Sequence, residues 1–205
     1  MECSWKEEVA NALTHGLGVL LSIPALVILL ISAYGDVSRI ISFAIFGASM
    51  IVLYVCSTLL HSLFWHKGKR LLQIFDHSAI FLLIAGTYTP FTLLLLRGAL
   101  GWTLFGIVWG LAVVGIVFKI FFVDRFVIAS TVVYIFMGWL AVIAIRPLYE
   151  LLKPAGFSLL LGGGILYTIG AIFFLWKRLP YHHAIWHVFV LGGSAMMYFC
   201  VLFYI

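Results

Sequence analysis

Charged residues are scarce in this sequence. Asp, Glu, Lys and Arg together make up 9% of the 205 residues, whereas hydrophobic residues make up 65%. A soluble domain typically carries about 25% charged residues, so this chain lacks the polar surface that a folded protein needs in water. The composition excludes a water-soluble protein and indicates an integral membrane protein, which we expect in the cell membrane.

Cysteines are also few, and the basic residues form no stripe. Cys3, Cys56 and Cys200 are far apart, so they provide neither a CxxC pair nor a disulfide framework. The net charge of +5 comes from residues scattered over short polar segments. We therefore expect membrane lipids with anionic head groups as partners, and we expect no nucleic acid. No soluble protein partner is evident from the sequence.

Long apolar runs occupy most of the chain, at 15–34, 40–64, 77–96, 102–122, 126–145, 157–176 and 184–205. A helix needs ~20 residues to cross a bilayer, and helices satisfy their own backbone hydrogen bonds in lipid. The sequence predicts an all-α membrane protein, a seven-transmembrane helix bundle that forms one domain over residues 1–205. Apart from one polar layer these runs carry almost no charge, which argues against a wide pore.

Lysine and arginine are unequally distributed between the two ends of the predicted bundle. With seven spans, eight of these residues fall on the side of the N-terminus and four on the opposite side. Cytoplasmic loops are enriched in Lys and Arg, so the N-terminus is predicted to be cytoplasmic and the C-terminus to lie outside. Lys119 is counted here among the basic residues of the cytoplasmic side.

Histidines gather in the cytoplasmic layer of the predicted bundle. His183 and His187 are four residues apart, so they project from one face of the last helix. Two imidazoles at this spacing can share a metal ion, and His61 could supply a third from the second span. Asp76 could be a fourth ligand, hold a water, or simply cap its helix. His66 is placed in the adjoining loop, and histidines at a membrane interface are also tolerated without a ligand role.

Several short motifs follow one another in a fixed order along the chain. They are ExxN and NxxxH (Glu8, Asn11, His15), SxxxH (Ser57, His61), an aspartate that opens the third span (Asp76) and HxxxH (His183, His187). As a set they resemble the hemolysin III group of the progestin and adiponectin receptor family, which is similar to alkaline ceramidases. The resemblance implies a seven-helix bundle in which His61, His183 and His187 hold Zn²⁺ near the cytoplasmic face. It also implies that Ser57 and Asp76 are polar partners of the site, with a water held near Asp76.

Two kinds of function fit this reading. One is a zinc-dependent hydrolase that cleaves an amide or ester bond of a membrane lipid, with Asp76 as the base and Ser57 as a donor to the developing oxyanion. The alternative is a non-enzymatic protein in which structural zinc braces the helices and the bundle senses or regulates membrane lipid state, or a protein with a hemolysin-like activity. Glu8, Asn11 and His15 either support the zinc ligands from behind or form an ordinary helix start at the interface.

Overall fold

The computed structural model describes residues 4–63 and 67–205, and every regular element within them is a helix. The elements are α1 (Trp5–Ser32), α2 (Val37–Ser62), α3 (Lys69–Pro90), the π-helix η1 (Phe91–Leu96), α4 (Gly98–Phe122), α5 (Val127–Trp139), the 3₁₀ helix η2 (Leu140–Ala144), α6 (Ile145–Leu175) and α7 (His182–Tyr204). The predicted all-α class is confirmed for this part of the chain. Cys3 and His66 lie outside the described residues.

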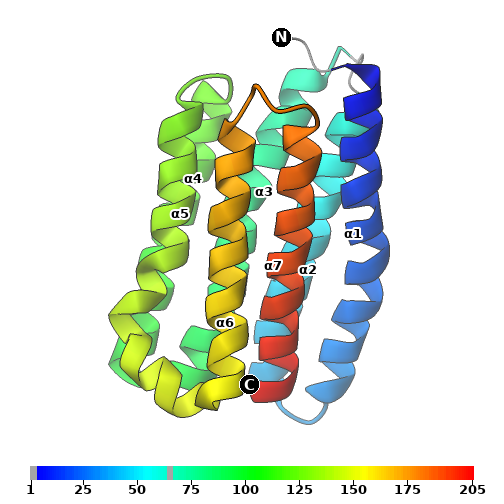
Figure 1. Ribbon diagram of the computed structural model, residues 1–205. Helices are drawn as coiled ribbons and strands as arrows, with labels where there is room; N and C mark the ends of the chain where they lie inside the picture. The colour runs from blue at the N-terminus through cyan, green and yellow to red at the C-terminus, as the bar shows by residue number, and fades with distance from the viewer. Residues whose placement is uncertain (1–3, 64–66) are drawn as a thin grey trace.

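Within the described ranges, six helical stretches are long and apolar enough to cross a membrane. One of them, Val127–Leu175, joins α5, η2 and α6 over 49 residues. It is interrupted at Lys153, whose φ of 58° and ψ of 170° are not helical, directly before Pro154. A residue before proline avoids the α region. Figure 1 shows the chain turning at the lower edge of the bundle between α5 and the rising part of α6. The chain is therefore a multi-pass membrane protein.

The helices stand side by side and close into a ring (Figure 1). Each of α1, α2 and α3 packs against the helix that follows it, α6 packs against α7, and α7 returns to α1. The starts of α1, α3 and α7 lie at the same end of the bundle as the end of α2 (Figure 1). We call this the histidine end, because His61, His183 and His187 lie on those parts of α2 and α7.

The first helix is polar inside and apolar outside. Its buried residues recur every three or four positions near its start, at Glu8, Asn11 and His15, which is the spacing of one helix face. Leu13 and Leu20 on the outer face are 69% and 70% exposed. In lipid this arrangement is favourable, because the apolar face meets hydrocarbon while the polar groups find partners inside the bundle. The helix begins where Ser4 and Glu7 form a capping box.

Close helix packing between α3 and α4 depends on Gly115. A Cβ at this position would lie 2.2 Å from the ring of Phe81, whereas a Cβ at Gly110 on the same helix would meet nothing within 4 Å. Phe81 is 2% exposed and its ring also packs against Tyr134, so it has little room to move. We expect Gly115→Ala to destabilise the fold by up to about 2 kcal/mol, because overpacking typically costs 1–3 kcal/mol and alanine returns about 1 kcal/mol of helix propensity.

Thermal unfolding of the purified protein in detergent checks this expectation, with Gly110→Ala as the matched control. Gly110→Ala adds the same methyl group to the same helix and should leave the melting temperature unchanged or raise it slightly. Equal melting temperatures for the two variants would show that Gly115 has no special packing role.

Candidate metal centre

Three histidines from two helices meet at the histidine end. His61 comes from the last turn of α2, and His183 and His187 come from the first turns of α7. Each offers one ring nitrogen, and these nitrogen atoms all lie within 4.8 Å of one another. The ring of His183 contacts both others, with centroids 4.9 Å from His61 and 4.6 Å from His187. The spacing of four in α7 places its two imidazoles on one face, as the sequence predicted.

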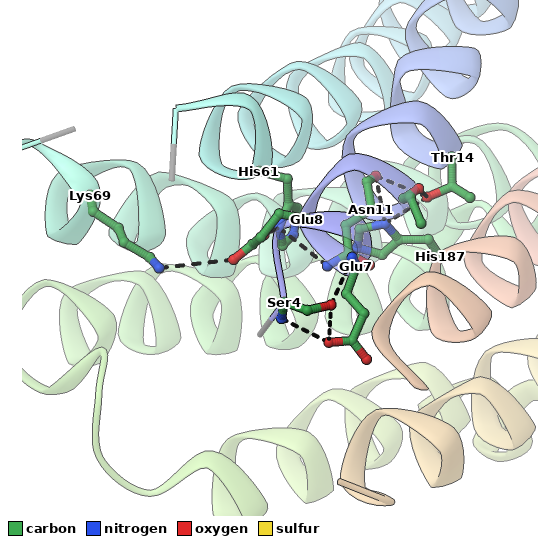
Figure 2. Close-up of polar contacts among 9 residues, drawn as sticks. Ser4, Glu7, Glu8, Asn11, Thr14, His61, Lys69 and His187 are labelled. Atoms are coloured by element: carbon green, nitrogen blue, oxygen red, sulfur yellow. Dashed lines mark hydrogen bonds and ion pairs between the residues drawn. The ribbon is translucent and has the colours of Figure 1, made fainter. Parts of the chain in front are cut away.

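Glu8 of α1 fixes the orientation of His61. The Nδ1 atom of His61 lies 2.6 Å from Oε2 of Glu8, and a carboxylate can only accept, so Nδ1 is the donor. Figure 2 shows Glu8 between His61 and Lys69, whose Nζ lies 3.9 Å from the other carboxylate oxygen. The Nε2 atom of His61 is buried and has no hydrogen-bond partner. The lone pair of that nitrogen is therefore available to a metal ion.

His187 is oriented in the same way by the next turn of α1. Its Nδ1 donates to the backbone oxygen of Asn11 at 3.1 Å. The hydroxyl of Thr14 lies 3.0 Å from the same nitrogen, and it donates its own proton to the carbonyls of Ala10 and Asn11 (Figure 2). Since Nδ1 carries the proton, Nε2 of His187 is the free nitrogen. Histidines that ligate metals usually donate their other ring nitrogen in this manner.

The donor set fits a metal ion. Two imidazoles have their Nδ1 atoms engaged by α1 and their Nε2 atoms free, and the unpartnered Nε2 of His61 is a buried polar atom that a ligand bond would satisfy. Three nitrogen donors without a fourth protein ligand are typical of catalytic rather than closed structural zinc sites. The cluster could therefore hold a metal ion and leave one position open.

The two remaining residues of the first motif differ in what they do. Asn11 reaches His187 through its backbone, and its side-chain oxygen is buried without a partner. His15 stacks on His187, with ring centroids 3.5 Å apart and planes inclined by 11°. Neither ring nitrogen of His15 has a hydrogen-bond partner. His15 therefore supports His187 by stacking, not by hydrogen bonding.

Ser57 and Asp76 lie beside the three histidines. Both are buried, with exposed fractions of 0% and 6%, and both line a cavity of about 140 Å³ together with His15, His183 and His187. Asp76 interacts electrostatically with His61. The structure thus places an acidic group and a hydroxyl at the same cavity wall as two of the candidate ligands, His183 and His187.

The start of α7 is held against α1. The carboxylate of Glu7 accepts a hydrogen bond from the backbone nitrogen of Tyr181 at 3.0 Å. Tyr181 has a φ of 56° and immediately precedes α7. This contact fixes the point at which α7 begins and therefore the position of both its ligand candidates.

Two residues of the site were not found from the sequence. Thr14, which lies between Asn11 and His15, contacts His187; its place inside the motif was the available signal. Lys119 was counted among surface cations, but it is 1% exposed and lines the same cavity. The correction has a physical reason, since Lys119 continues the three-to-four spacing of the buried face of α4.

Removal of the Glu8 carboxylate is expected to weaken metal binding by about 10–100-fold, the usual cost of losing the outer partner of a ligating histidine. Without it, Nδ1 of His61 loses its acceptor and the ring loses its fixed orientation. Competition with a chromogenic chelator measures the affinity of Glu8→Ala. Glu150→Ala is the control, because Glu150 is an exposed carboxylate paired with Arg146 at 3.2 Å. An unchanged affinity in Glu8→Ala would reject this role.

The helices and the site together define a class: an all-helical multi-pass membrane protein with a three-histidine cluster at one end. Within that class, the chain belongs to the haemolysin-III-related family, whose sequence model matches residues 3–198. This confirms the resemblance deduced from the motifs.

Relatives cover nearly the whole chain. Hemolysin-3 of Bacillus cereus is 65% identical over 202 residues, which is 98% of this chain and 92% of that protein. The hemolysin-3 homolog of Bacillus subtilis (strain 168) is 66% identical over 201 residues, 97% of this chain and 94% of that protein. The monocyte to macrophage differentiation factor of Homo sapiens is 27% identical over 207 residues, 97% of this chain and 84% of that protein. The human relative fits the wider progestin and adiponectin receptor family.

Proposed function

We propose that this protein binds Zn²⁺ through His61, His183 and His187 and hydrolyses an acyl bond, ester or amide, of a membrane lipid. The observation that carries the proposal is the open three-nitrogen cluster beside a buried carboxylate at the wall of an apolar cavity. Bound zinc would act as a Lewis acid that polarises the acyl carbonyl and makes water more acidic. Imidazole nitrogen is a preferred zinc ligand, which supports this metal over Mg²⁺ or Ca²⁺.

Asp76 acts as the general base of the proposed reaction. Its carboxylate takes a proton from the attacking water as the oxygen of that water bonds to the acyl carbon. The bond from that carbon to the leaving oxygen or nitrogen then breaks, and Asp76 returns the proton to the leaving atom. Ser57, whose buried hydroxyl lies beside the Asp76 carboxylate, donates to the carbonyl oxygen as it gains negative charge.

The cavity supports a lipid as the substrate. Away from its polar groups it is lined by apolar residues that include Leu83, Phe91, Leu104 and Met197, and an acyl chain is the ligand that such a surface accepts. The proposed partners are therefore membrane lipids, which enter between helices from the bilayer. The cell membrane is the proposed location.

Seven crossings of the membrane are proposed. A continuous helix of 49 residues would extend about 74 Å, more than twice the ~30 Å of the hydrocarbon core. The break at Lys153 supports two crossings in that stretch. α1 begins and α7 ends at opposite ends of the bundle (Figure 1), as an odd number of spans requires. We propose one domain over the whole chain, with the N-terminus and the metal centre at the cytoplasmic face.

The orientation gives a prediction for reporter fusions. A reporter that works only outside the cytoplasm should be active after Ile205, and one that works only inside should be active before Met1. The reason is the excess of Lys and Arg on the N-terminal side. A C-terminal reporter that works only in the cytoplasm would invert the topology and move the metal centre to the outer face.

A second function, structural zinc in a non-enzymatic membrane protein, is favoured by one observation. The cluster joins α2 to α7, and α1 contacts both ligating helices through Glu8 and Asn11, so a metal here would brace three helices. The deciding experiment is lipid turnover by the purified protein. We expect hydrolysis that stops when a chelator removes zinc and returns when zinc is added. No turnover of ceramide, acyl-ester or phospholipid substrates by zinc-loaded protein would favour the structural role.

A further inference from the structure

Lys119 lies inside the bundle, although it is only three residues from the end of α4. The buried residues of this helix include Val108, Ala112, Gly115 and Lys119, a spacing of three and four that defines one helix face. Lysines near helix ends usually extend their ammonium groups to the membrane surface. Lys119 instead continues the inward face of α4 and is 1% exposed.

No ion pair within residues 4–63 and 67–205 involves Lys119. The carboxylate that acts on it electrostatically is that of Asp124. Asp124 is itself 62% exposed and lies 3.9 Å from Arg70, so it belongs to the surface. A buried ammonium group without a paired anion is costly, and an anionic ligand would offset that cost.

Lys119 lines the same cavity as the metal centre, together with Ser130 of α5 and His77 of α3. Ser130 is 6% exposed, and its buried hydroxyl has no hydrogen-bond partner. His77 interacts electrostatically with both Lys119 and His61. The end of α4 and the start of α5 lie at the histidine end (Figure 1). The cavity therefore has two separate polar positions at the histidine end: one is the histidine cluster, and the other is formed by Lys119 and Ser130.

We propose that Lys119 and Ser130 form a subsite for the phosphate of a membrane glycerolipid whose acyl ester faces the three histidines. This rests on the proposed function, because the bound metal supplies the second polar position. In a glycerophospholipid the phosphate and the ester carbonyls are a few bonds apart, and the acyl chain suits the apolar remainder of the cavity. Ceramide and diacylglycerol have no phosphate to pair with Lys119. The substrate class is thus a phosphate-bearing glycerolipid.

Binding of two lipids that differ only in the phosphate tests this subsite. Dilauroyl phosphatidic acid and dilauroylglycerol are titrated into the full-length protein in a neutral detergent, and binding is followed by native mass spectrometry. The unmodified protein should prefer the phosphatidic acid by about tenfold or more, the usual value of a charge-assisted hydrogen bond. Lys119→Met should reduce this preference to below about twofold. Lys177→Met, which removes an exposed lysine near the start of α7, should keep it.

Equal binding of the two lipids by the unmodified protein, or a full preference in Lys119→Met, would overturn the proposal. Should Lys119→Met fail to fold, Lys119→Arg must keep the preference and Ser130→Ala must weaken it, and the opposite pattern would overturn it. The measurement does not depend on turnover. A phosphate preference in protein that hydrolyses no lipid would keep the subsite and reject the hydrolase, whereas hydrolysis without the preference would reject the subsite alone.

Discussion

Asp76→Asn is expected to keep most of its zinc and to lose lipid hydrolysis by about 10²–10⁴-fold, the usual effect of losing a general base. Asparagine preserves the shape of the side chain and can still form hydrogen bonds, but it cannot accept a proton from water. The change leaves the three histidines in place, and Asp76 is not a member of their cluster. Zinc content and hydrolysis are measured on the same purified sample.

The paired measurement separates a chemical role from a structural one. Full activity in Asp76→Asn would reject Asp76 as the base. A loss of activity in proportion to a loss of zinc would show that Asp76 mainly helps to hold the metal. Asp36→Asn serves as the control, because Asp36 caps the start of α2 through the backbone nitrogen of Arg39. That variant should keep both zinc and activity.

His187→Ala is expected to weaken zinc binding by more than the ~10–100-fold that follows the loss of an outer partner, since it removes one of three ligands. It should also lower the melting temperature, because metal binding that joins α2 to α7 contributes to the stability of the folded state. His187 is 1% exposed and is stacked on His15, so some destabilisation will come from lost packing. The informative quantity is therefore the rise in melting temperature on adding zinc, which should be large in the unmodified protein and nearly absent in the variant.

His182→Ala is the matched control for His187→Ala. His182 is the first residue of α7, and its ring centroid lies 6.1 Å from that of His183, but it is not one of the three clustered residues. Its removal should leave the zinc-dependent stabilisation intact. Equal losses in the two variants would mean that the histidines act as a general polar layer and not as a ligand set.

The helix class and the spacing of the α7 histidines were predictable from the sequence, because each depends on local pattern. Apolar runs give the helices, and the four-residue interval between His183 and His187 gives a shared face. Convergence with His61 required the topology as well, and alternating the direction of successive helices was enough to place the three residues at one end. Glu8 could be named from its motif, but its contact with His61 depends on how α1 packs against α2.

Other features depended on tertiary structure. The first apolar run starts at residue 15, whereas α1 begins at Trp5. The first turns of α1 are polar because they face the interior of the bundle, and Ser4 caps the start of the helix. Residues 146–156, between two predicted spans, were expected to form a loop, but those before the break at Lys153 are helical. Lys119 was assigned to the surface because a lysine near a helix end usually is. Its burial follows from the face of α4 that packs inward, which a charge count does not consider.

X-ray absorption at the zinc edge, combined with metal analysis of the same purified protein, tests the central claim most directly. We predict about one zinc per chain, with three nitrogen ligands at ~2.0–2.1 Å, and a reduced nitrogen count in His61→Ala. Protein that takes up no zinc when zinc is supplied, or zinc bound without imidazole ligands, would contradict it.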